Sequence, residues 1–275
     1  MFYFFYNNSI LCMTNKKLNY IFPKNPFQSI LMTLILIVTS LLVIVLFDNY
    51  LNVFFLDSNL FSFVKDFCSY FIAFLILNLI ARKKINSYPF KLSSIKIVLL
   101  VILVSICFAI AIGIPSYFFL YVNIDYSHIL IVKTAKLSIL GLISIIAITP
   151  LFEELIIRGI MLDGLLKNNS WKKAVIITTI LFILIHFDLL KTPSLIFSGL
   201  FLGWLYYKTK NLVLTIIVHS FNNLTTSIHP YITNNDFENY KYYGEYTFLV
   251  LLFSFIIFSI SLYFLIKTIN NDNRR

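Results

Sequence analysis

Long apolar runs recur along the whole of this 275-residue chain and leave little room for a soluble fold. Each run approaches the roughly 17–25 residues that cross a bilayer as a helix. The runs lie at about residues 27–47, 61–81, 95–122, 135–158, 172–188, 194–208, 211–228 and 246–267, and the fourth continues as an amphipathic helix to about residue 167. Charged residues make up only 12% of the chain, about half their share in soluble domains. We therefore predict an all-α polytopic membrane protein, a bundle of about eight transmembrane helices.

The charges in the loops predict how the chain is oriented. The loop after the first run carries Asp48 and Asp57 and no base, whereas the loops on either side of it in the chain are rich in lysine and arginine. Because basic loops stay in the cytoplasm, this alternation predicts two cytoplasmic termini and an even number of spans. We divide the chain into a cytoplasmic tail at residues 1–26, a single transmembrane domain at 27–267 and a cytoplasmic tail at 268–275.

The net charge of +10 follows from the same basic loops. It therefore predicts a lipid bilayer as partner and no nucleic acid. The bias toward lysine, asparagine, isoleucine and phenylalanine predicts a prokaryotic source and a cell-membrane location. No cleavable signal peptide is evident at the start, and Met13 is an alternative to Met1 as the first residue.

Polar and small residues interrupt the apolar runs at a few positions. The ionisable side chains well inside the runs are Glu153, Glu154, Arg158, His186 and His219. Such residues mark functional sites because charges at membrane depth are costly. Lys65 and Asp66 lie near the start of the second run and can reach an interface. Gly199 and Gly203 form a GxxxG pattern, which predicts that a neighbouring helix approaches closely.

Counting from the helix turns brings several of these residues to one depth. Glu153 and His186 each lie about 16 residues from the turn around "KNNSWKK", so an antiparallel helix pair places them level with one another. His219 and Asn223 stand about 14 Å and about 20 Å above the next turn, and their i,i+4 spacing puts them on one helix face. We therefore predict that three helices present these four side chains to one buried point.

Spacing also divides the two adjacent glutamates. Glu154 and Arg158 are i,i+4 with the acid first, the favoured orientation for an ion pair within a helix. Glu153 lies about 100° around the helix from Glu154, so we assign the Glu154–Arg158 pair to structural support and Glu153 to chemistry. Pro150, one turn earlier, can bend the helix and open it to water. The alternative is that all three charges form only a buried ion-pair network.

Three short motifs on separate runs make the sequence resemble a known family. They are "EELIIR" from Glu153 to Arg158, "FILIH" from Phe182 to His186, and "HSFNN" from His219 to Asn223. Their order resembles EExxxR, FxxxH and HxxxN of the CPBP intramembrane proteases, also called the CAAX-protease, bacteriocin-processing or Abi family. The resemblance implies an eight-helix membrane fold with its catalytic core at residues 135–228, and an endopeptidase that uses a buried water.

The resemblance also implies roles for individual residues. Glu153 and His186 would activate water, while His219 and Asn223 would bind the water or stabilise the oxyanion. Burial makes a carboxylate a stronger base, and an amide is a neutral donor to an oxyanion, which fits this division. A zinc ion held by Glu153, His186 and His219 is the alternative. Since a ligating glutamate could not also act as the free base, we favour activation of water without a metal.

The family suggests substrates and partners but does not fix them. We expect the substrate to be a membrane-associated peptide or a lipid-modified protein C-terminus, with a sensor kinase or a secreted-peptide system as partner. One alternative is a non-catalytic protein for bacteriocin immunity or sensor scaffolding. Another is a proton-coupled transporter that uses the carboxylates as a relay, although the sequence shows no repeat of the kind transporters often contain.

Overall fold

The computed structural model describes residues 22–113, 138–188, 192–232 and 244–272. Within these ranges the chain is helical and contains no strand, which confirms the predicted all-α class. The predicted end of the third run, the first residues of the fourth and the Met13 start lie outside the described residues.

In the part of the chain that the structure describes, eight long helical stretches correspond to the eight predicted runs. They are α2 (Pro26–Leu46) with η1 (Phe47–Leu51) and η2 (Asn52–Phe54); α3 (Ser58–Ala81); α4 (Ile95–Phe108) with η4 (Ala109–Gly113); α6 (Ile139–Ile143), η5 (Ser144–Ile148), α7 (Thr149–Glu154), η6 (Leu155–Leu162) and α8 (Asp163–Leu165) in succession; α9 (Trp171–His186); α10 (Thr192–Thr209); α11 (Leu212–Ile232); and α12 (Gly244–Asp272). A short turn, η3 (Ile85–Ser87), precedes α4. The last helix continues to Asp272, beyond the predicted end at residue 267.

Four helices of the described part are long and apolar enough to cross a membrane. They are Pro26–Phe54, Ser58–Ala81, Ile139–Leu165 and Leu252–Asp272, and a shorter apolar helix covers Ile95–Ala111. The other three stretches, α9, α10 and α11, are not in this set. Two of them carry imidazole side chains of the candidate site, His186 in α9 and His219 in α11.

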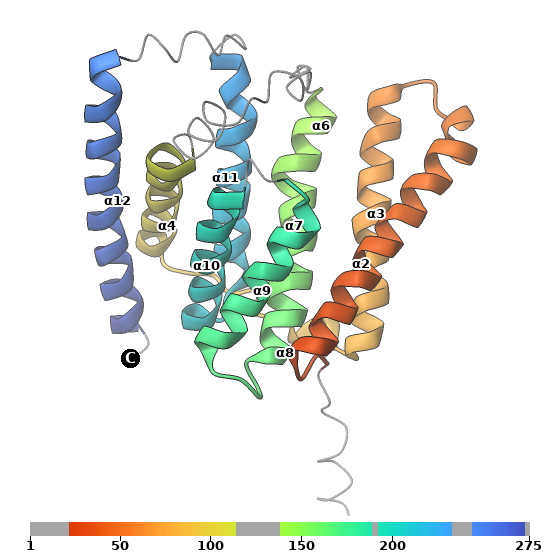
Figure 1. Ribbon diagram of the computed structural model, residues 1–275, viewed down its shortest axis with the longest axis horizontal. Coiled ribbons are helices and arrows are strands. Elements are labelled where there is room, and N and C mark those ends of the chain that lie inside the picture. Colours follow the sequence, from red (N-terminus) through yellow and green to blue (C-terminus); the bar gives the residue numbers. More distant parts are fainter. Residues whose placement is uncertain (1–21, 114–137, 189–191, 233–243, 273–275) are drawn as a thin grey trace, which may run out of the picture.

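The helices stand side by side, with the α2–α3 pair at one edge and α12 beside α4 at the other (Figure 1). Between these edges lie α6 to α11, which carry the predicted site. The first described helix begins and the last one ends at the same end of the bundle (Figure 1), as an even number of passes requires. Two buried apolar clusters hold the bundle together, one centred on α2, α3 and α7–α9 and one on α4 and α12, and both include residues of α10 and α11.

The GxxxG pattern of α10 lies against α9. A Cβ atom added to Gly199 would come within 2.7 Å of Cγ2 of Thr179, and one added to Gly203 within 2.8 Å of Cγ1 of Val175. Side chains at these two positions would push the helices apart, so the glycines allow the close contact that the pattern predicts.

A polar cluster ties several chain segments together at the end of the bundle where α2 begins. The Nζ of Lys83, which follows α3, lies 2.8 Å from Oδ2 of Asp163 and donates to the carbonyl of Gly159 at 2.7 Å. On the other carboxylate oxygen, Lys210 Nζ lies at 3.0 Å and the Tyr206 hydroxyl donates at 3.2 Å. The side chain of Lys83 is 1% exposed, so Asp163 compensates a buried charge.

Replacing Asp163 by Ala is therefore expected to destabilise the protein strongly. The variant leaves the ammonium of Lys83 buried without its carboxylate, which costs about 3 kcal/mol or more in comparable cases. Accumulation in the membrane and the thermal midpoint in detergent should both fall. Asp48→Ala is the matched control, since the Asp48–Lys65 pair has a similar length of 2.7 Å but a 46% exposed carboxylate. Equal effects of the two substitutions would contradict this assignment.

Candidate active site

The ion pair predicted from spacing is present and deeply buried. Arg158 Nη1 lies 2.6 Å from Oε1 of Glu154, and both side chains are at most 1% exposed. The guanidinium also reaches α10 and α9, because Nη2 donates to the Gly199 carbonyl at 3.4 Å and the group lies 4.9 Å from the ring centre of Phe182. The pair thus links three helical stretches of the core.

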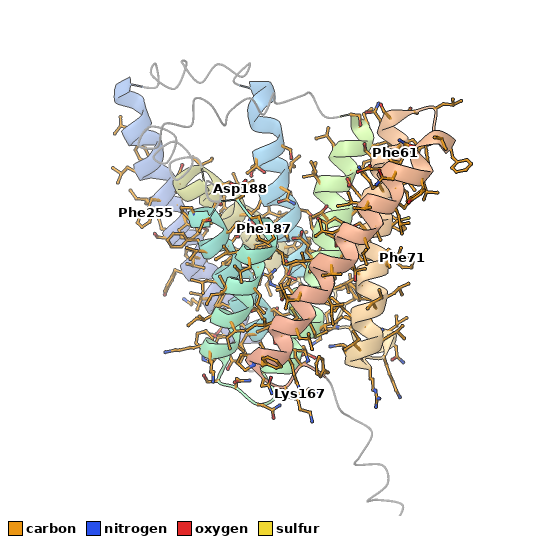
Figure 2. The ribbon with its side chains drawn as sticks, turned by 45° about the vertical axis from the view of Figure 1, so that its right-hand side comes forward. Phe61, Phe71, Lys167, Phe187, Asp188 and Phe255 are labelled. Atoms are coloured by element: carbon orange, nitrogen blue, oxygen red, sulfur yellow. The ribbon has the colours of Figure 1, made fainter. Side chains whose placement is uncertain are left out.

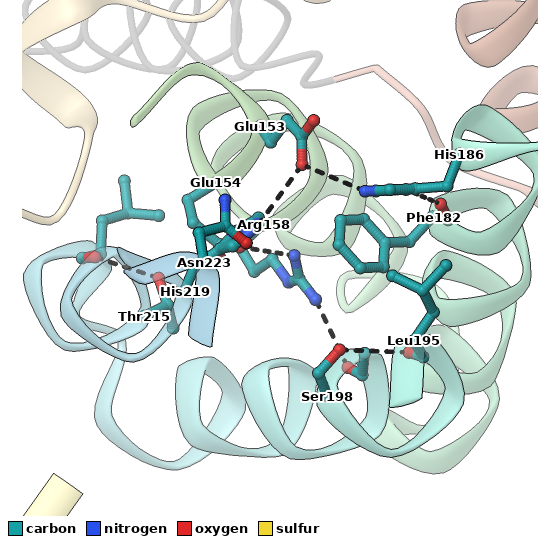
Figure 3. A network of polar contacts seen from close by, with 12 residues as sticks. Glu153, Glu154, Arg158, Phe182, His186, Leu195, Ser198, Thr215, His219 and Asn223 are labelled. Carbon is teal, nitrogen blue, oxygen red and sulfur yellow. Dashed lines mark hydrogen bonds and ion pairs between the residues drawn. The ribbon is translucent and has the colours of Figure 1, made fainter. Parts of the chain in front are cut away.

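Glu154 also contacts one of the predicted site histidines. Its Oε1 lies 3.0 Å from Nδ1 of His219 in α11, so the same oxygen serves the guanidinium and the imidazole. Its i,i+4 spacing predicts only the contact of Glu154 with Arg158. In the structure it also orients His219 and belongs to the polar network of the site (Figure 3).

Glu153 points away from this ion pair and toward the two histidines, as Figure 3 shows. Its Oε2 lies 3.7 Å from Nε2 of His219 and 4.0 Å from Nε2 of His186. The three side chains that the depth argument brought to one level are therefore in contact range. Oε2 is buried and has no hydrogen-bond partner among the described residues.

The Nδ1 atoms of both imidazoles make contacts that fix the orientation of the rings. Nδ1 of His186 lies 2.7 Å from the carbonyl oxygen of Phe182, and Nδ1 of His219 faces the Glu154 carboxylate. Carbonyl and carboxylate oxygens accept hydrogen bonds but do not donate them, so each Nδ1 carries the proton in these contacts. Both Nε2 atoms are thereby directed toward Oε2 of Glu153.

Phe182 is buried in the core and packs among the polar groups of the site. Its ring meets the imidazoles of His186 and His219 edge-on, with centroid distances of 4.5 Å and 5.7 Å. Helix α9 ends at His186, and the next residue, Phe187, has a left-handed backbone with φ of 46°. In Figure 2, Phe187 lies well away from the end of the bundle that Lys167 marks, so α9 ends partway along the length of the bundle.

Asn223 lies one turn beyond His219 on α11 and contacts the backbone of the neighbouring helix. Its Nδ2 donates to the carbonyl of Ile145 at 2.9 Å, in the π-helical segment η5. No hydrogen bond from Asn223 to Glu153 occurs in the described part of the chain. An amide nitrogen has two hydrogens, so one of them is not used by the Ile145 contact.

The helix that carries the glutamates changes its hydrogen-bonding pattern on both sides of them. The π-helical segment η5 ends just before Pro150, and η6 begins directly after Glu154. Proline cannot donate a backbone hydrogen bond, and wide π turns accommodate such gaps in a helix and are frequent at functional sites. The Glu153–Glu154 pair thus occupies a short α-helical piece between two wide turns.

Sequence reasoning missed Tyr70, which contacts Glu153 from another helix. The Tyr70 hydroxyl, on α3, donates to Oε1 of Glu153 at 3.3 Å. One turn earlier on the same face, Asp66 accepts from the Ser144 hydroxyl at 2.9 Å. In the sequence, the i,i+4 spacing of Asp66 and Tyr70 inside an apolar run is the signal that marks this helix face. It does not indicate which residues the face contacts.

The donor types of the site suit zinc, which binds imidazole nitrogen and carboxylate oxygen. However, the described residues contain no group of three His, Cys, Asp or Glu side chains arranged to hold a metal ion. We therefore derive no step through a metal, and the zinc alternative at Glu153, His186 and His219 stays a hypothesis for experiment.

The comparison with protein families agrees with the motifs. Residues 135–225 match the family model of the Type II CAAX prenyl endopeptidase Rce1-like proteins. This segment contains Glu153, His186, His219 and Asn223, and the match confirms the resemblance seen in the sequence. No curated protein and no solved structure matches the chain significantly. At family level the match supports an intramembrane endopeptidase that acts on a membrane-associated protein or peptide.

Arg158→Met is expected to destabilise the protein, because it leaves the Glu154 carboxylate buried without its cation. Loss of one partner from a buried pair costs about 3–5 kcal/mol, whereas loss of both charges is often tolerated. The double variant Glu154→Gln/Arg158→Met should therefore recover much of the thermal midpoint and membrane accumulation lost in the single variant. A Gln side chain can still accept from His219. A double variant that is less stable than Arg158→Met alone would contradict this account of the pair.

Proposed function

We propose that this protein is an intramembrane endopeptidase in which Glu153 and His186 activate a water molecule. One observation carries the proposal: Oε2 of Glu153 is buried, lacks a hydrogen-bond partner in the described residues, and faces the Nε2 atoms of two imidazoles. A buried polar atom without a partner is costly. A water molecule that donates to Oε2 would satisfy it and would stand between a carboxylate and two nitrogen bases.

The reaction then begins with proton transfer from this water to Oε2 of Glu153. The water oxygen attacks the scissile carbonyl carbon, and the C–N bond breaks when the nitrogen leaves as an amine. The proton that the amine needs comes from the Glu153 carboxyl group or from His186, whose Nε2 lies 4.0 Å from Oε2. No other reactant than water and the peptide is required, and both protons of the water are accounted for in the products.

Asn223 and His219 are assigned to water binding and to the oxyanion. The second amide hydrogen of Asn223 can donate to the carbonyl oxygen as it becomes negative, a contribution of about 3 kcal/mol in other hydrolases. The first hydrogen is used on Ile145, and this bond orients the amide. The contact of Nδ1 with Glu154 orients His219, so that Nε2 of His219 faces Oε2 of Glu153.

The location of the site and the family match support a substrate class. The glutamates lie within a helix long and apolar enough to cross a membrane, which supports a substrate that reaches them from the bilayer. We propose a membrane-associated peptide or a lipid-modified protein C-terminus, processed by a protein with both termini in the cytoplasm of a prokaryotic cell. A neighbouring sensor kinase or secreted peptide would be the partner in that setting.

Glu153→Ala and His186→Ala are expected to abolish processing while the protein still accumulates in the membrane. Each variant removes one group that acts on the water and leaves the Glu154–Arg158 pair intact. The measurement compares membrane and secreted peptides of a deletion strain complemented with wild type or with either variant, alongside cleavage of a prenylated peptide with a CaaX end. Asp48→Ala, at an exposed carboxylate, is the control. Normal processing by both variants would instead favour a non-catalytic immunity or scaffolding role.

Activity is expected to persist without a stoichiometric metal. If Glu153 deprotonates the water directly, the reaction does not require a bound metal ion. Purified active protein should therefore contain zinc well below one equivalent. The test measures the metal content and the peptide cleavage of one preparation, before and after treatment with a chelator. Stoichiometric zinc, together with loss of cleavage on chelation and its return on adding zinc, would overturn the metal-free scheme.

A further inference from the structure

We propose that Tyr70 is a positioning residue that selects which oxygen of Glu153 faces the two histidines; this inference rests on the proposed function. The two carboxylate oxygens of Glu153 contact different helices. Oε1 accepts from the Tyr70 hydroxyl on α3 at 3.3 Å, whereas Oε2 faces His219 and His186. Tyr70 lies outside residues 135–225, so the family match does not include it.

A carboxylate needs such a contact to keep one orientation. The terminal torsion of a glutamate side chain is broad, so the two oxygens exchange places easily when nothing distinguishes them. A phenolic hydroxyl can donate while a carboxylate can only accept, so the contact holds Oε1 toward α3. Oε2 is then presented to the imidazoles without a competing partner.

Helix α3 is itself held firmly at the level of Tyr70. Phe152, the residue before Glu153, packs among three phenylalanines of α3, with centroid distances of 5.8 Å to Phe67, 6.0 Å to Phe71 and 5.9 Å to Phe74. These rings set the register between α3 and α7, because they flank Tyr70 on one helix and Glu153 on the other. Precise placement of a base requires rigid neighbours of this kind.

A second polar contact between the same helices offers a matched comparison. The Ser144 hydroxyl donates to Asp66 at 2.9 Å, one turn from Tyr70 on α3, and this bond does not involve Glu153. If the Tyr70 contact only tied α3 to its neighbour, removal of either bond would have similar consequences. If Tyr70 positions the base, only its removal changes the chemical step.

The experiment compares Tyr70→Phe with Ser144→Ala in the full-length protein in lipid nanodiscs, using a prenylated peptide with a CaaX end as probe. Tyr70→Phe should lower kcat about tenfold, because the free energy of one hydrogen bond to a charged group is similar to the change in activation free energy that slows a reaction tenfold. Its KM should stay unchanged, and Ser144→Ala should keep both constants. An unchanged kcat in Tyr70→Phe, or an equal fall in the two variants, would overturn the inference.

A substrate-free measurement separates this inference from the proposed function. The infrared carboxylate band of Glu153 is assigned as the band that disappears in Glu153→Gln. Tyr70→Phe should shift this band because it removes the hydrogen bond to Oε1, and Ser144→Ala should not. If wild type leaves the probe uncut, the proposed activity fails on that probe and the band position alone decides the inference. A band at the wild-type position in Tyr70→Phe would refute it.

Discussion

The buried ion pair between Glu154 and Arg158 is the interaction on which the rest of the site depends. Two charges at membrane depth are costly, and mutual compensation together with further hydrogen bonds lowers that cost. Nη2 of the guanidinium also donates to the Gly199 carbonyl of α10, and Oε1 of the carboxylate also contacts His219 of α11. Nε of Arg158 and Oε2 of Glu154 have no partner among the described residues. The pair therefore holds α10 and α11 against the helix that carries Glu153.

The helical fold and the proximity of Glu153, His186 and His219 could be predicted because helix geometry converts sequence distance into depth. Apolar runs of sufficient length gave the eight helical stretches, and equal counts from one turn placed Glu153 level with His186, which lies 4.0 Å from it. The i,i+4 rule separated Glu154 from Glu153 for the same reason. These predictions depend only on the rise and the turn of a helix, which vary little among sequences.

Contacts that depend on how distant helices pack could not be obtained in this way. Tyr70 lies more than eighty residues before Glu153, and nothing in the spacing of α3 indicates which helix it faces. The Asn223 bond to Ile145 depends on the π-helical segment η5, which the sequence did not predict. Individual boundaries also differ, as at α12, where packing and the loop that precedes it decide where a helix begins and ends.

The Glu153 carboxylate has one oxygen with a hydrogen-bond partner and one without. Each imidazole has its Nδ1 occupied, by the Phe182 carbonyl or by Glu154, and Glu153 has its Oε1 occupied by Tyr70. What remains is Oε2, with two Nε2 atoms directed at it from distances too long for direct hydrogen bonds. An unsatisfied buried carboxylate oxygen lowers stability, and Oε2 of Glu154 also lacks a partner among the described residues, so a missing partner alone does not mark Glu153. What distinguishes Oε2 of Glu153 is the gap between it and the two Nε2 atoms that face it. A site that must receive a water molecule has a reason to keep it open.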